Sequence, residues 1–86
     1  SDAMDAVSDE LKALRDHMAE YASNADGADV DALKARLTEI GEGIDTLSGA
    51  PVADSIALRA AAQIDGTPAA YKTAAETLTI GLSAAN

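Results

Sequence analysis

The chain has 86 residues, a formal net charge of −9, and no cysteine, phenylalanine or tryptophan. This length allows one small domain, and the lack of cysteine excludes disulfides and thiolate metal sites. The negative charge disfavours binding to nucleic-acid phosphates, and no apolar run approaches the roughly 20 residues that span a membrane. We therefore expect a single domain that binds neither nucleic acid nor a membrane.

The first three residues are expected to have a different origin from the rest. Ser1-Asp2-Ala3 followed by Met4 is typical of an expression scar, here residues 1–3, before an initiator methionine. On this interpretation the domain covers residues 4–86 and no signal peptide precedes it. The expected location is then the cytoplasm, with secretion without a signal peptide as the alternative.

The first half of the chain shows a helical period. Large apolar residues recur in steps of three and four, first at Met4, Val7, Leu11, Leu14, Met18 and Tyr21, then at Val30, Leu33, Leu37, Ile40, Ile44 and Leu47. This spacing predicts amphipathic helices over 4–24 and 28–48. Gly27 breaks the register, and Asp26 or Asp29 is placed to cap the second helix. So short a connection makes the two helices antiparallel neighbours.

Proline and glycine divide the second half. Pro51 and Pro68 suit the first turns of helices over 51–65 and 68–84, and Thr67 is placed to cap the latter. The inward residues are expected to be Val52, Ile56 and Ile64 in the third helix and Tyr71, Ala75, Leu78 and Leu82 in the fourth. Residues 77–83 also alternate as a strand would, but no other segment offers a strand partner.

The predicted architecture is all-α, a small antiparallel four-helix bundle. Residues 1–48 hold 12 acids and 4 bases, whereas residues 49–86 hold 3 acids and 2 bases. The bundle thus joins an acidic hairpin (4–48) to a nearly neutral, alanine-rich hairpin (51–84). Alanine faces bury little area per residue, so the core is marginal and dimerisation could complete it.

Two surfaces are candidates for binding. If the first two helices are antiparallel, one end of the bundle collects an acidic docking pole of Asp5, Asp9, Glu10, Glu39, Glu42 and Asp45. A solvated face that keeps the protein soluble, or suits it to high salt, explains the same acids. The apolar candidates for a packing or interface surface are Leu58, Tyr71, Leu78, Ile80 and Leu82.

No motif indicates catalysis, a cofactor or a defined metal site. The acidic residues at 24–31 invite comparison with a calcium loop, but alignment on Gly27 places Ala22 and Leu33 where the key ligands belong. Only weak binding of divalent cations is left open. His17 is the single histidine, and no serine stands in a nucleophile pattern. We therefore expect no enzyme.

The sequence favours a non-catalytic helical module for protein–protein interaction or assembly, with a protein partner or self-association. A small acidic regulator or inhibitor that mimics a polyanion is the alternative. An outside alternative comes from Leu47-Ser48-Gly49, which resembles the Trp-x-Gly turn of the helical-hairpin proteins of type VII secretion. Those proteins are also small, acidic and alanine-rich, and the resemblance implies two long helices and secretion. The tryptophan is absent here, and Tyr71 lacks an acid four residues later.

Overall fold

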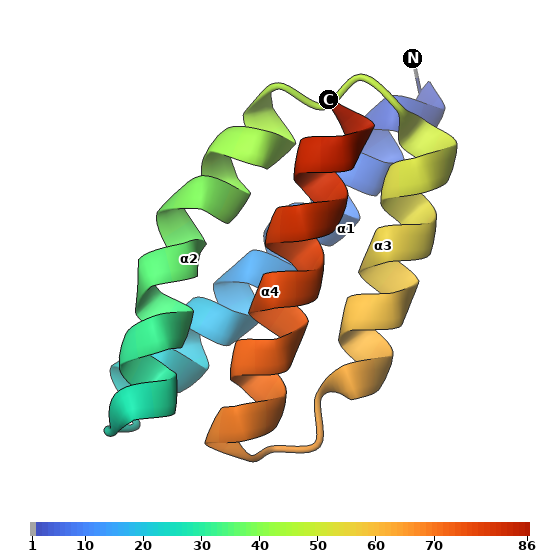
Figure 1. Ribbon diagram of the computed structural model, residues 1–86. Coiled ribbons are helices and arrows are strands. Elements are labelled where there is room, and N and C mark those ends of the chain that lie inside the picture. The colour runs from blue at the N-terminus through green and yellow to red at the C-terminus, as the bar shows by residue number, and fades with distance from the viewer. Residues whose placement is uncertain (1) are drawn as a thin grey trace.

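The protein is a bundle of four helices in the computed structural model, which describes residues 2–86 (Figure 1). The helices are α1 (Asp2–Ser23), α2 (Ala28–Asp45), α3 (Ala50–Gln63) and α4 (Pro68–Ala85). The all-α prediction is confirmed, and residues 77–83 are helical rather than a strand. The first residue of the predicted scar lies outside the described residues. Four separate helices also differ from the two long ones that the type VII secretion resemblance implies.

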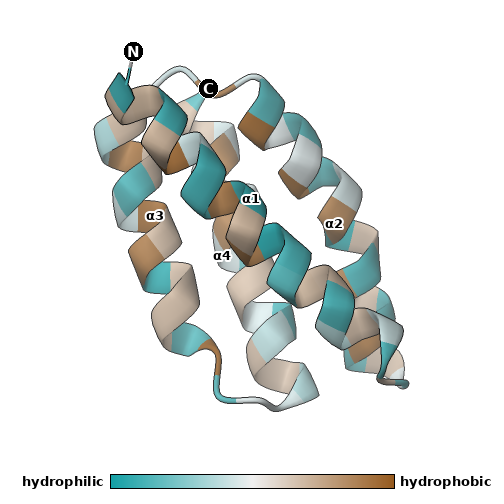
Figure 2. Cartoon of the chain, turned by 180° about the vertical axis from the view of Figure 1, so that it is seen from behind, coloured by the Kyte–Doolittle hydropathy of each residue, from teal (hydrophilic) through white to brown (hydrophobic). Residues whose placement is uncertain are grey.

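The helices form two antiparallel hairpins packed face to face. α1 packs against α2 and α3, and α4 packs against the same two helices, so α1 and α4 lie on opposite sides of the bundle. α1 crosses behind the other helices at an angle (Figures 1 and 2). It lies beside α2 near the Gly27 turn and diverges from α2 toward its own first residues. The bundle measures 39 × 21 × 19 Å.

Gly27 makes the turn between α1 and α2. Its φ is +116°, which side chains other than glycine rarely adopt, and it is the N-cap of α2. No side chain caps this helix, so the expectation that Asp26 or Asp29 does so is wrong. Asp29 instead forms an ion pair with Lys72 at the start of α4, with Oδ1 3.6 Å from Nζ.

Thr67 caps α4 as predicted. Its hydroxyl oxygen accepts a hydrogen bond from the backbone N–H of Ala70, with a distance of 3.2 Å. The hydroxyl and the N–H of Thr67 in turn donate to Asp65 Oδ1 over 2.6 and 2.9 Å. These two bonds hold the pKa of Asp65 below its ordinary value, because they stabilise the carboxylate.

Replacing Thr67 by alanine should lower the free energy of unfolding by about 1 kcal/mol, the usual cost of losing such a cap. Thr67→Ser is the matched control and should stay close to the wild type, because it keeps the hydroxyl. A pKa lowered by folding contributes stability at neutral pH that is lost as pH falls through it. Thermal melts should therefore show that the loss of stability caused by Thr67→Ala becomes smaller at acidic pH. A loss that is equally large in Thr67→Ser and that does not change with pH would contradict this account.

The core draws on all four helices. Its buried residues are Leu11, Met18, Ala22, Val30, Leu33, Ile40, Ile44, Ala53, Ile56, Ala57, Ala60, Tyr71, Ala74, Ala75, Leu78 and Leu82. The α3 part is a stripe of alanines with Ile56. Val52 is 52% exposed, so its predicted inward position is wrong, since Ala53 takes the inward place beside it. α3 packs against α1 and α4, so these alanines face the large core side chains of those two helices.

Two glycines let the helices approach closely. A Cβ atom on Gly43 would lie 3.0 Å from Leu82 Cβ, and one on Gly81 would lie 2.6–2.7 Å from three side-chain carbons of Ile56. Gly43 therefore marks the close contact of α2 with α4, and Gly81 that of α3 with α4. Each glycine lowers the helix propensity of its segment and permits a short interhelical distance.

Candidate interaction surfaces

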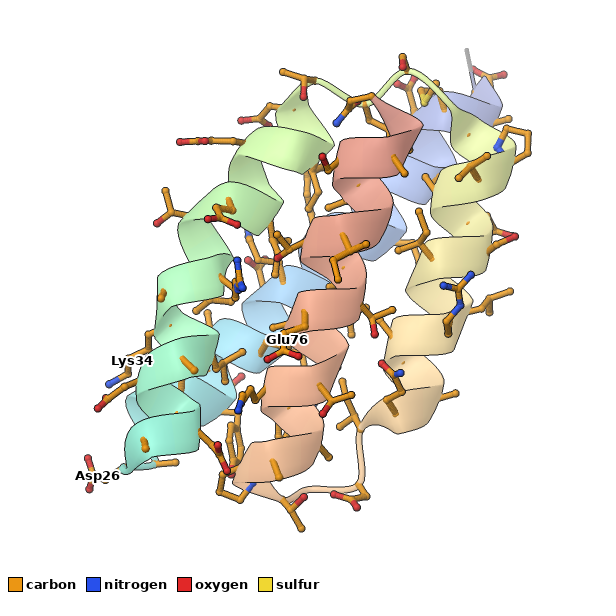
Figure 3. All side chains as sticks on the ribbon, viewed as in Figure 1. Asp26, Lys34 and Glu76 are labelled. Carbon is orange, nitrogen blue, oxygen red and sulfur yellow. The ribbon has the colours of Figure 1, made fainter. Side chains whose placement is uncertain are left out.

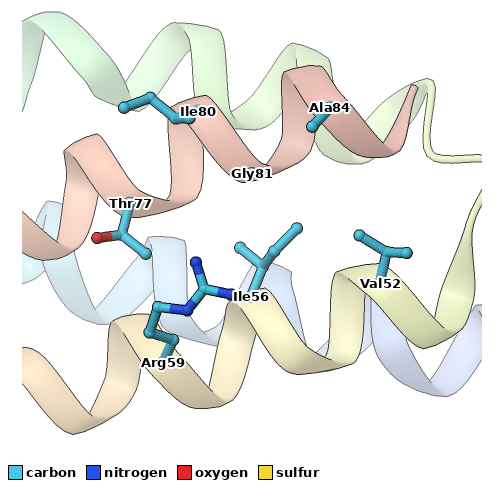
Figure 4. A pocket seen from close by; sticks show the side chains of 7 residues that line it. All are labelled: Val52, Ile56, Arg59, Thr77, Ile80, Gly81 and Ala84. Carbon is cyan, nitrogen blue, oxygen red and sulfur yellow. The ribbon is translucent and has the colours of Figure 1, made fainter.

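An open groove of about 330 Å³ runs between α3 and α4 (Figure 4). Its lining is mainly apolar: Val52, Ile56, Arg59, Thr77, Ile80, Gly81 and Ala84. Ile56 and Gly81 lie in contact across it, because the missing side chain of Gly81 leaves space that Ile56 occupies. The groove offers apolar contacts and a single cationic group, which suits the docking of an apolar side chain.

The large apolar residues that remain at the surface all belong to α3 and α4. Among residues 2–86 they are Val52, Leu58 and Ile80, which are 52%, 61% and 71% exposed. Val52 and Ile80 line the groove from opposite helices, whereas Leu58 does not line it. The outward side of α1, by contrast, is mostly hydrophilic (Figure 2).

The five residues predicted to form a packing or interface surface fall into a buried group and an exposed group. Tyr71, Leu78 and Leu82 are buried in the chain's own core, so they are not available to a partner. Leu58 and Ile80 are exposed. The sequence prediction missed Val52, Arg59 and Thr77 as members of the groove, because it did not specify how α3 and α4 face each other.

The six residues of the predicted acidic docking pole lie at one end of the bundle in two groups. All are exposed: Asp5, Asp9 and Glu10 near the start of α1, and Glu39, Glu42 and Asp45 near the end of α2. α1 and α2 diverge toward this end, and the last turn of α4 lies between them (Figure 1). The crossing of α1 thus separates the two groups, and a common binding role for them stays a prediction.

The α2 group borders a second groove, of about 470 Å³, between α2 and α4. It is lined by Glu39, Glu42, Gly43, Thr46, Thr79, Leu82, Ser83 and Asn86. Asn86 closes it at the end of the chain, where its side-chain amide donates to the carbonyl of Gly43 over 3.0 Å. Glu39 is already engaged in an ion pair with Arg36 at 3.2 Å. Most residues that line this groove carry polar side chains, and its acidic groups are on one wall.

His17 and the two tyrosines form a cluster that joins α1 to α4. The rings of Tyr21 and Tyr71 are stacked with centroids 3.7 Å apart, and Tyr71 Oη lies 2.8 Å from His17 Nε2. Desolvation, with a smaller contribution from Tyr21, raises the pKa of Tyr71, so its hydroxyl stays protonated at neutral pH. The tyrosines pack inward as predicted, but the hydrogen bond to His17 was not foreseen. We interpret the cluster as structural.

No metal centre is assembled in the described part of the chain. Within residues 2–86, no group of three or more His, Cys, Asp or Glu side chains is arranged to hold a metal ion. Asp26, in the predicted acidic loop, points away from the bundle (Figure 3). Weak binding of divalent cations stays a prediction. Across the same residues, no helix has the length and apolar character needed to cross a membrane.

Comparisons with protein-family models, with curated proteins and with solved structures find no match to this chain. The surfaces of the chain itself are therefore the basis for assigning a function. Of these, the α3–α4 groove is the one that combines an apolar lining with exposed large side chains.

Proposed function

We propose that this chain is a non-catalytic helical module for protein–protein interaction or assembly, and that it binds through the α3–α4 groove. The observation that carries the proposal is the exposure of Val52 and Ile80 on opposite sides of a groove lined by Ile56 and Gly81. Covering a large aliphatic side chain contributes about 1.5–3 kcal/mol. Exposed apolar side chains that are grouped together mark interaction sites, and these two lie beside one groove.

The distribution of charge supports the same surface. The hairpin that bears the groove has a near-neutral balance of 3 acids and 2 bases over residues 49–86. Interface centres are depleted of charged residues. The polyanion alternative receives no comparable support, because the acids of α1 and α2 diverge at the end of the bundle where they were expected to gather.

The experiment compares two aspartate variants at exposed positions. Ile80→Asp places a charge beside the groove, whereas Leu58→Asp places one on α3 away from it. Both should melt like the wild type, since both side chains are exposed. Immobilised wild-type protein and Leu58→Asp should retain the same partner from an extract of the source organism, and Ile80→Asp should lose it.

Mass spectrometry identifies the retained protein, and purified partner then gives the affinity. We expect Ile80→Asp to weaken binding at least tenfold, about the effect of losing one well-packed side chain at an interface. Equal affinities of the two variants for that partner would overturn the assignment to the groove.

A further inference from the structure

Two charged groups without partners flank the exposed apolar residues of the α3–α4 face. Arg59 on α3 and Glu76 on α4 make no hydrogen bond or ion pair within residues 2–86, whereas Lys72 and Arg36 are paired with acids. Figure 4 shows Arg59 across the groove from Thr77 and Ile80, and Figure 3 shows Glu76 on the outward side of α4. Glu76 does not line the groove itself; it lies four residues, about one helical turn, before the exposed Ile80 on α4.

This arrangement is self-complementary. A two-fold axis perpendicular to the face, passing midway between Arg59 and Glu76, would place Arg59 of one copy over Glu76 of the other and repeat the same contact in reverse. Symmetric dimers are built in this way, because each contact between two different residues occurs twice. The same rotation covers the exposed side chain of Ile80 with the second copy.

We infer that the occupant of the α3–α4 groove is a second copy of this chain, joined by two symmetric Arg59–Glu76 pairs around the apolar centre. This inference rests on the proposed function and names its partner. The net charge of −9 opposes self-association elsewhere, because residues 1–48 carry 12 of the 15 acids. The near-neutral α3–α4 face lets two copies approach with least repulsion.

The available surface is large enough for such a dimer. A standard interface covers about 800 Å² on each partner. That is roughly one sixth of the accessible surface of 4586 Å², and the long sides of the bundle, which measures 39 × 21 × 19 Å, are of that order. The paired charges would set the register of the two copies, and the apolar residues between them would supply most of the affinity.

Charge reversal tests the pairing through sedimentation equilibrium at about 0.15 M salt, where the general repulsion between two acidic chains is screened beyond about 8 Å. Wild type should associate to twice its mass of 8.7 kDa. Arg59→Glu alone sets a new carboxylate against Glu76 at both contacts, and Glu76→Arg alone sets a new guanidinium against Arg59. Each single variant should dimerise at least tenfold more weakly than the wild type.

An equimolar mixture of the two variants provides the decisive result. The Arg59→Glu copy offers two carboxylates and the Glu76→Arg copy offers two guanidinium groups, so both contacts again join an acid to a base. The mixture should therefore associate about as strongly as the wild type, and its failure to recover association would overturn the inferred pairing. Thermal melts verify that each variant folds.

Other outcomes separate this inference from the proposed function. If wild type stays at 8.7 kDa at every concentration while Ile80→Asp still abolishes binding of another protein, self-pairing is wrong and the interaction module stands. If wild type dimerises but neither charge reversal weakens it, the dimer uses another face and the inference is overturned. If no association of any kind depends on Ile80, both proposals fail.

Discussion

Replacing Leu78 by alanine should lower the free energy of unfolding by about 2–5 kcal/mol, the usual cost of truncating a fully buried leucine. Leu78 is 0% exposed, on the inward side of α4. A domain of this size has a total stability on the order of 5–15 kcal/mol, so the loss is a large part of it. Thermal or urea unfolding followed by circular dichroism measures the effect.

Ile80→Ala is the matched control, on the same helix and two residues further along. Its side chain is 71% exposed, and its removal should change the stability of the isolated chain by no more than about 0.5 kcal/mol. Comparable losses at both positions would contradict the division between core and surface that the structure makes on α4. At concentrations where the chain pairs, the Ile80 variant should instead lose association.

Gly81→Ala should lower the stability by about 1–2 kcal/mol, although alanine is the better helix former. The added Cβ would lie 2.6–2.7 Å from three carbons of Ile56, far inside normal contact, so the Ile56 side chain or the two helices would have to shift. A loss of this size lowers the melting temperature of a small domain by roughly 4–8 °C for each kcal/mol.

Gly41→Ala gives the opposite expectation in the same fold. Its Cβ would come near only the end of the Arg15 side chain, at 3.1 Å from Nη1, which can move aside. The variant should gain about 0.5–1 kcal/mol from helix propensity alone. If Gly41→Ala and Gly81→Ala changed the stability equally, the close contact of Gly81 with Ile56 would not be the reason for the glycine at position 81.

A double variant isolates the contact with Ile56. In an Ile56→Ala background the three carbons that obstruct Gly81→Ala are gone, so the substitution should become neutral or stabilising. The coupling free energy from the four proteins measures the steric conflict directly. Independent, additive effects would place the defect of Gly81→Ala elsewhere.

Local signals were enough to predict the helix starts. Gly27 and the Thr67-Pro68 pair punctuate the chain where α2 and α4 begin, because a positive φ and a fixed proline φ act within a few residues. The end of α2 was placed too late, at 48 instead of Asp45. Leu47 continues the apolar spacing and packs on the core from the connecting turn, so periodicity alone could not mark where the helix stops.

The surfaces were harder to predict, because they depend on how helices cross. The positions of Asp5 and Asp45 predict a common pole only if α1 and α2 stay side by side, but α1 diverges from α2 toward its first residues (Figure 1). Because α3 is rich in alanine, its sequence does not determine which of its faces turns toward the core. In the structure the face with Ala53 is buried and Val52 points outward. The contact of Tyr71 with His17 likewise depends on two helices far apart in sequence.

The most direct test of the α3–α4 surface is site-specific photo-crosslinking in the intact chain. A photoreactive residue in place of Ile80 should give an abundant cross-linked product of twice the chain mass, whereas one in place of Leu58 should give little. Both positions are exposed, so exposure alone does not distinguish them. Equal yields from the two positions, or no product from position 80 at any concentration or with any added partner, would contradict the account.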